Sequence, residues 1–358
     1  MEYLIGPFLV SAGISVAVSW LVIRWGRAMG IIDDPKKHIH PKVVHETPVP
    51  RGGGLPILAA WLISAALFLP WEKKIVGIGL GVILLGIIGF VDDKFEEKVS
   101  PHFRLVINVL AALMVIGGGV GIAFITSPGG GIWDLSSPRW CWGDHCLWLL
   151  SDLFALVWLV WTQNIVGWSS GVDGQLPGFV IVAAGVMAAM GLRFGTDINQ
   201  QLIIVMAAIV AGAYAGFLLW NWYPQKIMPG YGGKSLAGFL LGVLAIFSGA
   251  KVGAMIMVLC IPFIDGAAVI VKRLAEHRSP VWGGREHLHH YLLDKGWGKR
   301  RIAVFYWLMS LVFGVGALQL NSQSKYFTMA TAGLLIGGVI LWFHYFSTSS
   351  KRQGPDNG

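Results

Sequence analysis

The sequence predicts an all-α fold: a polytopic transmembrane helical bundle of about eleven spans, with the N-terminus outside and the C-terminus cytoplasmic. Of its 358 residues, 55% are hydrophobic and only 13% are charged, whereas a soluble domain carries about 25% charged residues. So few charges cannot cover a soluble globule, but they suffice for a protein whose outer face contacts lipid. The 48 glycines also fit a bilayer, where small residues let helices pack closely.

Stretches of roughly 20 apolar residues, the length needed to cross a bilayer, recur along the chain. We expect spans at 4–23, 54–70, 75–91, 105–125, 147–166, 176–192, 202–222, 236–250, 252–271, 302–320 and 327–347. The eighth is short and almost merges with the ninth, so ten spans is the alternative count. The first lacks a basic region and a cleavage site, which predicts an anchor rather than a removable signal peptide.

The Lys and Arg residues predict the orientation. Of these 27 residues, 21 fall in the odd-numbered loops and the C-terminal tail, and six fall on the other side. The positive-inside rule therefore puts the odd-numbered loops in the cytoplasm of a multi-pass protein of the inner or plasma membrane. We expect a single domain over residues 1–350, a polar tail at 351–358, and cytoplasmic loops at 24–53, 92–104, 164–175, 221–235 and 272–301.

The net charge of +8 and the pI near 9.4 are thus explained by orientation and anion binding, without a nucleic-acid partner.

Two of the three cysteines, Cys141 and Cys146, fall in the external loop 126–146. They form either a disulfide, in an oxidising compartment, or two free thiols. A zinc site built from them with Asp144 and His145 matches the usual ligand spacing only weakly.

Nearly all groups capable of chemistry lie in the predicted cytoplasmic loops. The first loop carries His45 and Arg51 and ends in the glycines 52–54. Its prolines exclude a long helix, and we expect the glycines to let the backbone approach a ligand closely. The alternative is a solvated linker whose charges only set the orientation.

The second loop begins with Asp92 and Asp93 at the end of the third span. Adjacent carboxylates at a membrane boundary are costly unless they bind a cation, share a proton or accept hydrogen bonds. The pair suits a divalent metal or a general base, and a solvated helix end is the alternative. Arg104, which begins the next span, is interpreted as a snorkelling anchor.

The third loop, 164–175, has no basic residue, so orientation does not explain its polar residues. Asn164 and Asp173 predict a hydrogen-bonding site beside the bilayer, with an ordinary Gly-Asp turn as the alternative.

The fourth loop ends in Gly-Lys-Ser, including Lys234. It is not a phosphate-binding P-loop, because no strand precedes it and the first glycine of that motif would fall at Met228. Its glycine-rich turn can still hold phosphate through backbone N–H groups.

The fifth loop contains Arg285 and three histidines within four residues, His287, His289 and His290. Imidazoles bind metals, and an arginine beside several histidines also suits a diphosphate through charge-assisted hydrogen bonds. Both interpretations remain open at this point.

In this order, the five loops resemble the polyprenyl-phosphate N-acetylhexosamine-1-phosphate transferase family over roughly residues 30–295. The matching positions are His45, Pro48, Pro50, Arg51, Gly53, Gly54, Asp92, Asp93, Asn164, Gly171, Asp173, Gly174, Asn221, Pro224, His287, His289 and His290. Asp265 and Arg273 look like the family's Pro-x-x-Asp and Arg pair. The His-Leu-His-His form is more similar to the undecaprenyl-phosphate GlcNAc-1-phosphate transferases than to the branch that takes UDP-MurNAc-pentapeptide.

The resemblance implies a phosphoglycosyltransferase. It would move a sugar-1-phosphate from a UDP-sugar, such as UDP-GlcNAc or another UDP-HexNAc, to undecaprenyl or another polyprenyl phosphate, release UMP and initiate cell-envelope glycan synthesis. Asp92 or Asp93 would orient or deprotonate the lipid phosphate, and Asp93 and Asp173 would hold Mg²⁺ or Mn²⁺. The implied substrate-binding residues are His45, Arg51, Asn164, Asp173, Asn221, Lys234, Arg285, His287, His289 and His290. The partners are the membrane, the lipid and the nucleotide sugar, and a homodimer is compatible with the sequence.

Three departures from the family pattern are visible. Gly167 replaces a second Asn, Ser170 replaces a frequent Asp, and either Tyr231 or Gly232 stands where the family has an Asp. In relatives the first and last of these positions help to hold magnesium. An alternative function is therefore a catalytically impaired protein of the same fold that binds lipid phosphate or nucleotide. A transporter is a weaker alternative, because transporters place ionisable groups near the bilayer midplane.

Overall fold

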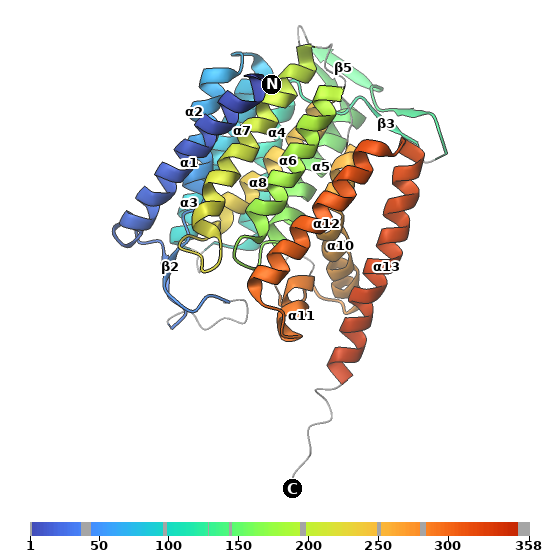
Figure 1. Ribbon diagram of the computed structural model, residues 1–358. Helices are drawn as coiled ribbons and strands as arrows, with labels where there is room; N and C mark the ends of the chain where they lie inside the picture. Colours follow the sequence, from blue (N-terminus) through green and yellow to red (C-terminus); the bar gives the residue numbers. More distant parts are fainter. Residues whose placement is uncertain are drawn as a thin grey trace.

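The computed structural model is an all-α bundle of long helices that run side by side between its two ends (Figure 1). It describes residues 2–36, 44–95, 99–127, 129–142, 145–193, 198–248, 252–279 and 284–349. The helices are α1 (Glu2–Met29), α2 (Gly54–Phe68), α3 (Lys73–Lys94), α4 (Pro101–Gly117), α5 (Leu149–Trp168), α6 (Gln175–Arg193), α7 (Ile198–Asn221), α8 (Gly230–Phe247), α9 (Val252–Val258), α10 (Cys260–Ala275), α11 (Leu288–Asp294), α12 (Lys299–Gln319) and α13 (Ser322–Ser349).

Each predicted span overlaps one of these helices, and the multi-pass membrane class is confirmed. Within the described residues, eight helices are long and apolar enough to cross a membrane. The count is nine if α9 and α10, which meet at an 85° bend, form one broken span. The helices α2 and α4 are shorter apolar segments. The total of eleven spans and the sides of the two termini stay predictions.

Local signals explain several helix ends. The Ser100 side chain accepts a hydrogen bond from the backbone N–H of Phe103, and Pro101 occupies the first helical position of α4. Both are preferred at helix N-termini, because the hydroxyl satisfies an orphan donor and proline lacks one. The α2 helix ends at Phe68, just before Leu69-Pro70, where the residue preceding a proline disfavours helical geometry.

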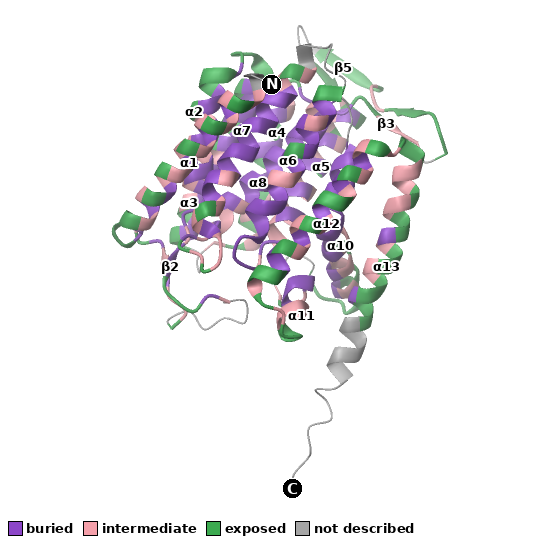
Figure 2. Cartoon of the chain, viewed as in Figure 1, coloured by how far each residue is buried: buried purple, intermediate pink, exposed green. Residues whose placement is uncertain are grey.

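The helices α7 and α8 form the centre of the bundle. In each, 78% of the apolar window is buried, compared with 11% in α13 at the edge. The first helix packs along α7, while α3 and α5 pack along α8. Figure 2 shows the buried residues concentrated on these central helices and the exposed ones on the outer helices. The outward-facing Leu, Ile and Val side chains are the surface expected to contact lipid.

The external loop predicted at 126–146 contains two antiparallel hairpins. The first pairs β3 (Phe124–Thr126) with β4 (Ile132–Asp134), and the second pairs β5 (Arg139–Trp142) with β6 (His145–Trp148). Cys141 and Cys146 are opposite each other in the second hairpin and form a disulfide. The disulfide alternative is therefore confirmed, and neither thiolate is left for a zinc ion. Asp144 of the weak zinc pattern lies outside the described residues.

At the opposite end, β1 (Ile32–Asp33) pairs with β2 (Val49–Pro50) and joins the two ends of the first loop. The helix α1 continues to Met29, six residues into the loop predicted at 24–53, and the described residues from there to Gly53 contain no helix, as the prolines predict. The tail at 351–358 lies outside the described residues.

The glycines of the first loop serve a different role from the expected one. Gly53 donates its N–H to the Met228 carbonyl at 3.0 Å, and a Cβ on Gly53 would lie only 2.5 Å from that oxygen. A Cβ on Gly54 would lie 2.9 Å from the Cα of Gly232, and one on Gly89 would overlap the same Cα. These glycines therefore let α2, α3 and α8 meet backbone to backbone, and the expectation that they approach a ligand is wrong.

The start of α8 also differs from the prediction. The helix begins at Gly230 rather than near residue 236, so Lys234 lies on a helix instead of in a loop. Glycine-rich sequence argues against a helix when considered alone. Here the contacts with Gly54 and Gly89 require residues without side chains, and this packing overrides the propensity.

Candidate active site

The adjacent carboxylates at the end of α3 have different partners. Both oxygens of Asp92 bind Arg104, with its Nε at 2.6 Å and Nη2 at 3.1 Å. Arg104 is thus an ion-pair partner, not merely a snorkelling anchor. One oxygen of Asp93 accepts the backbone N–H of Tyr231 at 2.8 Å. The other, Oδ2, is buried and has no hydrogen-bond partner within the described part of the chain.

Tyr231 joins α8 to this carboxylate pair. Its hydroxyl donates to the side-chain oxygen of Asn108 on α4 at 2.7 Å, and its ring lies 5.5 Å from the Arg104 guanidinium. The sequence predicts Tyr231 only as a possible position of a missing metal ligand, and it does not predict Asn108 as a site residue. Their partners are more than 100 positions away along the chain, so no local pattern reveals the contacts.

His45 and Arg51 meet at a carboxylate that the sequence analysis also missed. The Nε of Arg51 donates to Asp33 at 2.8 Å, and Nε2 of His45 lies 3.7 Å from the same oxygen. Burial lowers the pKa of His45, and the nearby cations Arg51 and Lys299 lower it further, against an opposing effect of Asp33. The imidazole of His45 is therefore neutral at neutral pH.

Lys234 is on α8, three residues after Tyr231, whose N–H binds Asp93. A Cβ on Gly167 would lie 3.7 Å from the Cβ of Lys234, in ordinary contact. Gly167, which replaces the family's second Asn, is therefore a spatial neighbour of Lys234.

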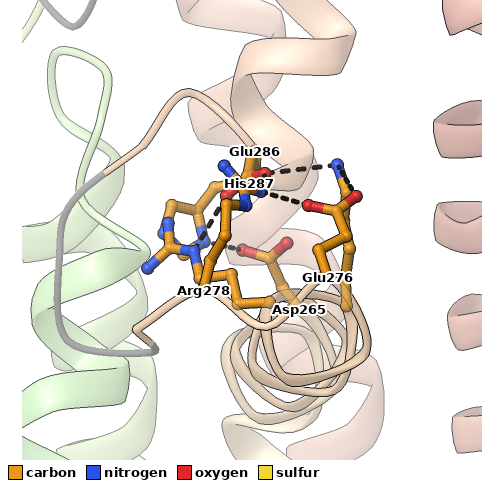
Figure 3. Close-up of polar contacts among 7 residues, drawn as sticks. Asp265, Glu276, Arg278, Glu286 and His287 are labelled. Carbon is orange, nitrogen blue, oxygen red and sulfur yellow. Dashed lines mark hydrogen bonds and ion pairs between the residues drawn. The ribbon is translucent and has the colours of Figure 1, made fainter.

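The histidine cluster is held by α10. Nδ1 of His287 lies 3.0 Å from Oδ2 of Asp265 (Figure 3). The other oxygen of Asp265 accepts the Leu288 backbone N–H at 2.8 Å. The ring of His289 stacks on His287 at 5.8 Å and lies 4.2 Å from His290. Burial lowers the pKa of His289 well below its usual value, and the neighbouring histidines and cations act in the same direction.

Glu286, next to His287, attaches the histidine segment to α10 at a second point. It forms ion pairs with Arg273 at 2.8 Å and Lys272 at 3.2 Å, and it also binds Arg278, which reaches Glu276 as well (Figure 3). Burial raises the pKa of Glu286, but the hydrogen bonds from Arg273, Arg278 and Lys272 outweigh it and lower the pKa to about 2. The residue before His287 is thus fixed to α10 as a carboxylate.

The remaining predicted residues bind other parts of the protein. Oδ2 of Asp173 accepts the Gln225 N–H at 3.2 Å, and its Oδ1 lies 3.9 Å from the Lys299 ammonium. The Asn221 side chain accepts the Gly174 N–H at 3.0 Å and donates to the Ile227 carbonyl at 2.8 Å. Asn221 therefore joins the third and fourth loops.

Two further predicted residues lie at the margins of this constellation. The Asn164 amide donates to the Val160 carbonyl of its own helix at 2.7 Å. Arg285 donates to the exposed Asp294 at 2.6 Å, while remaining within electrostatic reach of His289. The charge of Arg285 therefore influences His289, although the Arg285 side chain binds Asp294. Asn164 is on a helix because α5 continues to Trp168.

Two carboxylates could receive a divalent cation. Asp93 Oδ2 and Asp173 Oδ1 are buried oxygens that accept no hydrogen bond from the described residues. Magnesium typically takes one or two carboxylates, together with water and substrate phosphates. Asp92 does not fit, because both its oxygens bind Arg104. Among the described residues no group of three or more His, Cys, Asp or Glu could hold a metal. Each carboxylate thus offers an oxygen of the kind that magnesium takes, and the assignment of Asp93 and Asp173 as metal ligands stays a prediction.

The chain is similar to known transferases. The family model described as glycosyl transferase family 4 matches residues 75–249. A probable undecaprenyl-phosphate N-acetylglucosaminyl 1-phosphate transferase of Bacillus subtilis is 24% identical, and the match covers 94% of this chain and 90% of that protein. A decaprenyl-phosphate N-acetylglucosaminephosphotransferase of Mycolicibacterium smegmatis is 24% identical, with 97% and 90% covered.

A phospho-N-acetylmuramoyl-pentapeptide-transferase of Methylacidiphilum infernorum is 28% identical, with 75% of this chain and 78% of that protein covered. Both branches of relatives thus match over most of their lengths. Together with the ordered loop motifs, these similarities support the polyprenyl-phosphate N-acetylhexosamine-1-phosphate transferase family, and residues 75–249 match glycosyl transferase family 4.

Proposed function

We propose that the protein transfers a sugar-1-phosphate from a UDP-sugar to a polyprenyl phosphate and releases UMP, with UDP-GlcNAc or another UDP-HexNAc as donor and undecaprenyl phosphate as acceptor. The reaction would take place on the cytoplasmic side of the inner or plasma membrane and begin the synthesis of a cell-envelope glycan. The names of the relatives support a sugar-phosphate transfer to a polyprenyl phosphate.

One observation carries the proposal: the first turn of α8, next to Lys234, is held against the carboxylate pair, since the Tyr231 N–H donates to Asp93 at 2.8 Å. Arg51 is within electrostatic reach of both carboxylates. A site for phosphoryl transfer needs carboxylates and cations around one small volume, because its catalysis is mostly positioning and charge neutralisation.

In the proposed reaction, an oxygen of the lipid phosphate attacks the β-phosphorus of the UDP-sugar. A new O–P bond forms, the bond from the β-phosphorus to the bridging oxygen breaks, and its electron pair leaves with UMP. Asp93 orients the lipid phosphate and accepts its proton when it carries one. Asp92 holds the Arg104 guanidinium beside the Tyr231 ring, and its charge counters that of the phosphates.

The histidines and Arg285 grip the diphosphate and the sugar of the donor. Asp173, Asn164 and Asn221 line or support the nucleotide side, and His45 with Arg51 closes the first loop over it. A divalent cation, Mg²⁺ or Mn²⁺, would be held by the open oxygens of Asp93 and Asp173 and would supply charge neutralisation when bound.

The test is UMP release by the purified protein from radiolabelled UDP-GlcNAc and undecaprenyl phosphate, with and without magnesium. We expect lipid-dependent release, and a panel of UDP-sugars then identifies the preferred donor. No release from any UDP-sugar, in a protein that binds the lipid phosphate, contradicts the proposal.

That outcome would favour a second candidate function, a catalytically impaired member of the same fold that binds lipid phosphate or nucleotide. The observation favouring it is the ion pair of Arg104 with Asp92, which occupies both oxygens of one of the two adjacent carboxylates. The departure at Tyr231 or Gly232, one of which stands where the family has an Asp, favours the same function.

A further inference from the structure

The turn between α5 and α6, residues 171–175, is held from α12 by one tryptophan. Nε1 of Trp307 donates to the Gly174 carbonyl at 3.1 Å and to the Gln175 carbonyl at 3.3 Å. A Cβ on Gly178, in the first turn of α6, would overlap the same nitrogen, so this glycine makes room for the indole. Trp307 lies on α12, after the last of the five loops that carry the family motifs, so those motifs do not reveal it.

The other side of the turn is fixed as well. Asn221 accepts the Gly174 N–H at 3.0 Å, so Gly174 is held at its N–H by Asn221 and at its carbonyl by Trp307. The Trp222 ring lies 5.1 Å from the Trp307 ring, and a Cβ on Gly174 would lie only 2.7 Å from Trp222. Gly174 has a φ of +75°, which a glycine adopts without strain. The indole of Trp307 thus belongs to a closely packed support for this residue.

The turn carries a group that the proposed reaction uses. Asp173 directly precedes Gly174, and its Oδ1 lies 3.9 Å from the ammonium group of Lys299, which is also on α12. At the other end of the turn, a Cβ on Gly171 would overlap Nε2 of His289, so the turn abuts the histidine cluster. A shift of the Gly174 carbonyl would therefore move Asp173 relative to both neighbours, and a misplacement of about 1 Å can cost about 10²-fold in rate.

We propose that Trp307 is a positioning residue for the transfer reaction: its indole N–H fixes the Gly174 carbonyl and thereby places the Asp173 carboxylate. This inference rests on the proposed function for the reaction that it affects. Trp307 does not have to touch a substrate, because it acts through the turn. Its own position is fixed by packing against Gly178 and Trp222, as an effective support for a site residue requires.

Two variants remove this hydrogen bond from opposite sides. Trp307→Phe keeps an aromatic ring but lacks the N–H donor, and Gly178→Ala displaces the indole while Trp307 remains. Each has a matched control. Trp158→Phe removes a bond of the same kind, from Nε1 to the Gly242 carbonyl at 3.1 Å. Gly185→Ala adds a Cβ to the same helix as Gly178, at a place where no described atom lies within 4 Å.

The first readout is the amide hydrogen–deuterium exchange of residues 171–175 in the full-length protein in detergent. We expect Trp307→Phe and Gly178→Ala to raise the exchange rate about 2- to 10-fold, the factor that corresponds to a lost neutral hydrogen bond. The two controls should leave it unchanged. Unchanged exchange in Trp307→Phe overturns the inference, and so does an equal rise in Trp158→Phe. This readout needs no turnover.

The second readout is the single-turnover rate of UMP release from radiolabelled UDP-GlcNAc. Trp307→Phe should lower this rate about 2- to 10-fold. It should have little further effect in an Asp173→Asn background, because a positioning residue acts through the residue that it places. Equal losses in both backgrounds indicate a purely structural role and overturn the inference. Faster exchange at the turn in a protein that releases no UMP from any UDP-sugar would reject the proposed function and retain the hold of Trp307 on the turn.

Discussion

The Asp265 carboxylate on α10 holds the start of α11 at two points, at Nδ1 of His287 and at the backbone N–H of Leu288. Because Nδ1 faces a carboxylate, it carries the proton and leaves Nε2 as the nitrogen available to a substrate. Asp265 does not need to touch the substrate to matter, since it fixes both the tautomer and the orientation of the ring. It is a positioning residue with a testable effect.

Asp265→Asn should lower turnover about 10- to 100-fold, which corresponds to the 1.5–3 kcal/mol of a hydrogen bond to a charged group. The amide can present an N–H group to Nδ1 and select the other tautomer, so the pH profile of kcat should change as well. UMP release measured across pH 6 to 9 checks both effects. The control is Asp152→Asn, at the opposite end of the bundle, where the carboxylate accepts the Trp148 N–H. Equal losses in both variants would indicate a general effect on folding.

Asp92→Asn and Asp93→Asn should each reduce turnover by about 10²- to 10⁴-fold while the protein remains folded. The structure adds a difference between them. Asp92→Asn leaves the Arg104 guanidinium without its carboxylate, so Arg104→Gln should share part of the Asp92 defect but not the Asp93 defect. Single-turnover rates of the three variants and of the Asp92→Asn, Arg104→Gln double variant measure this coupling. Near-normal rates in both carboxylate variants would remove their assigned role.

Glu286 predicts an acid-dependent loss of stability. Its pKa is about 2 in the folded protein, compared with an ordinary value of 4.5. A lowered pKa means that its contribution is present above pH 4.5 and is lost as the pH falls toward 2. Glu286→Gln should therefore unfold at a lower temperature at pH 7 and lose less further stability on acidification than the unmodified protein. Thermal scans by tryptophan fluorescence measure both, with the more exposed Glu276→Gln as control.

If a metal ligand has been lost, an Asp can be restored without disrupting the packing at only one of the two aligned positions. Gly232→Asp would press its Cβ to 3.2 Å from the Cα of Gly89, so we expect it to disrupt the packing of α8. Tyr231→Asp introduces a carboxylate at a residue whose backbone N–H already donates to Asp93. Combined with Gly167→Asn, which has room beside Lys234, it should increase the affinity for Mg²⁺ or Mn²⁺.

Electron paramagnetic resonance of bound Mn²⁺ measures this gain without relying on activity. The reference is the unmodified chain, and Tyr231→Phe is the control for loss of the Asn108 contact. If the restored variant binds Mn²⁺ no better than Tyr231→Phe does, the damaged-site interpretation is wrong.

The orientation can be tested by cysteine labelling from the two sides of the membrane. Lys295→Cys should react only from the cytoplasm and Asp134→Cys only from outside, because both positions are exposed at opposite ends of the bundle. The native background is low, since Cys141 and Cys146 are bonded to each other and Cys260 is buried. The reverse labelling pattern would invert the predicted topology.

The spans and the chemistry-bearing loops could be predicted because both depend on local sequence. Hydropathy locates a helix that must satisfy its backbone in lipid, and Asp92-Asp93 or the three histidines are visible as runs. The partners could not be predicted. Arg104 with Asp92 and Tyr231 with Asp93 depend on how α3, α4 and α8 pack, and residues 12 and 138 positions apart give no shared pattern.

Two local features were misinterpreted for the same reason. Gly53 and Gly54 suggested room for a ligand, but the room is filled by the backbone of residues 228–232. Glycine-rich sequence before Lys234 suggested a loop, but close packing makes it the first turn of α8. A glycine shows that something approaches closely, and only the tertiary structure shows what that is.

The contact of Gly54, Gly89 and Gly232 has a mechanical consequence. No side chain separates α2, α3 and α8 at this crossing, so there is no rotamer that could absorb a tilt of one helix relative to the others. Changes in bilayer thickness, which helices usually accommodate by tilting, must then move Asp93, Tyr231 and Lys234 together as one body. We therefore expect the carboxylates and the lysine to keep their spacing in thin and thick membranes, so that lipid composition changes how fast the lipid substrate arrives rather than the geometry of the site.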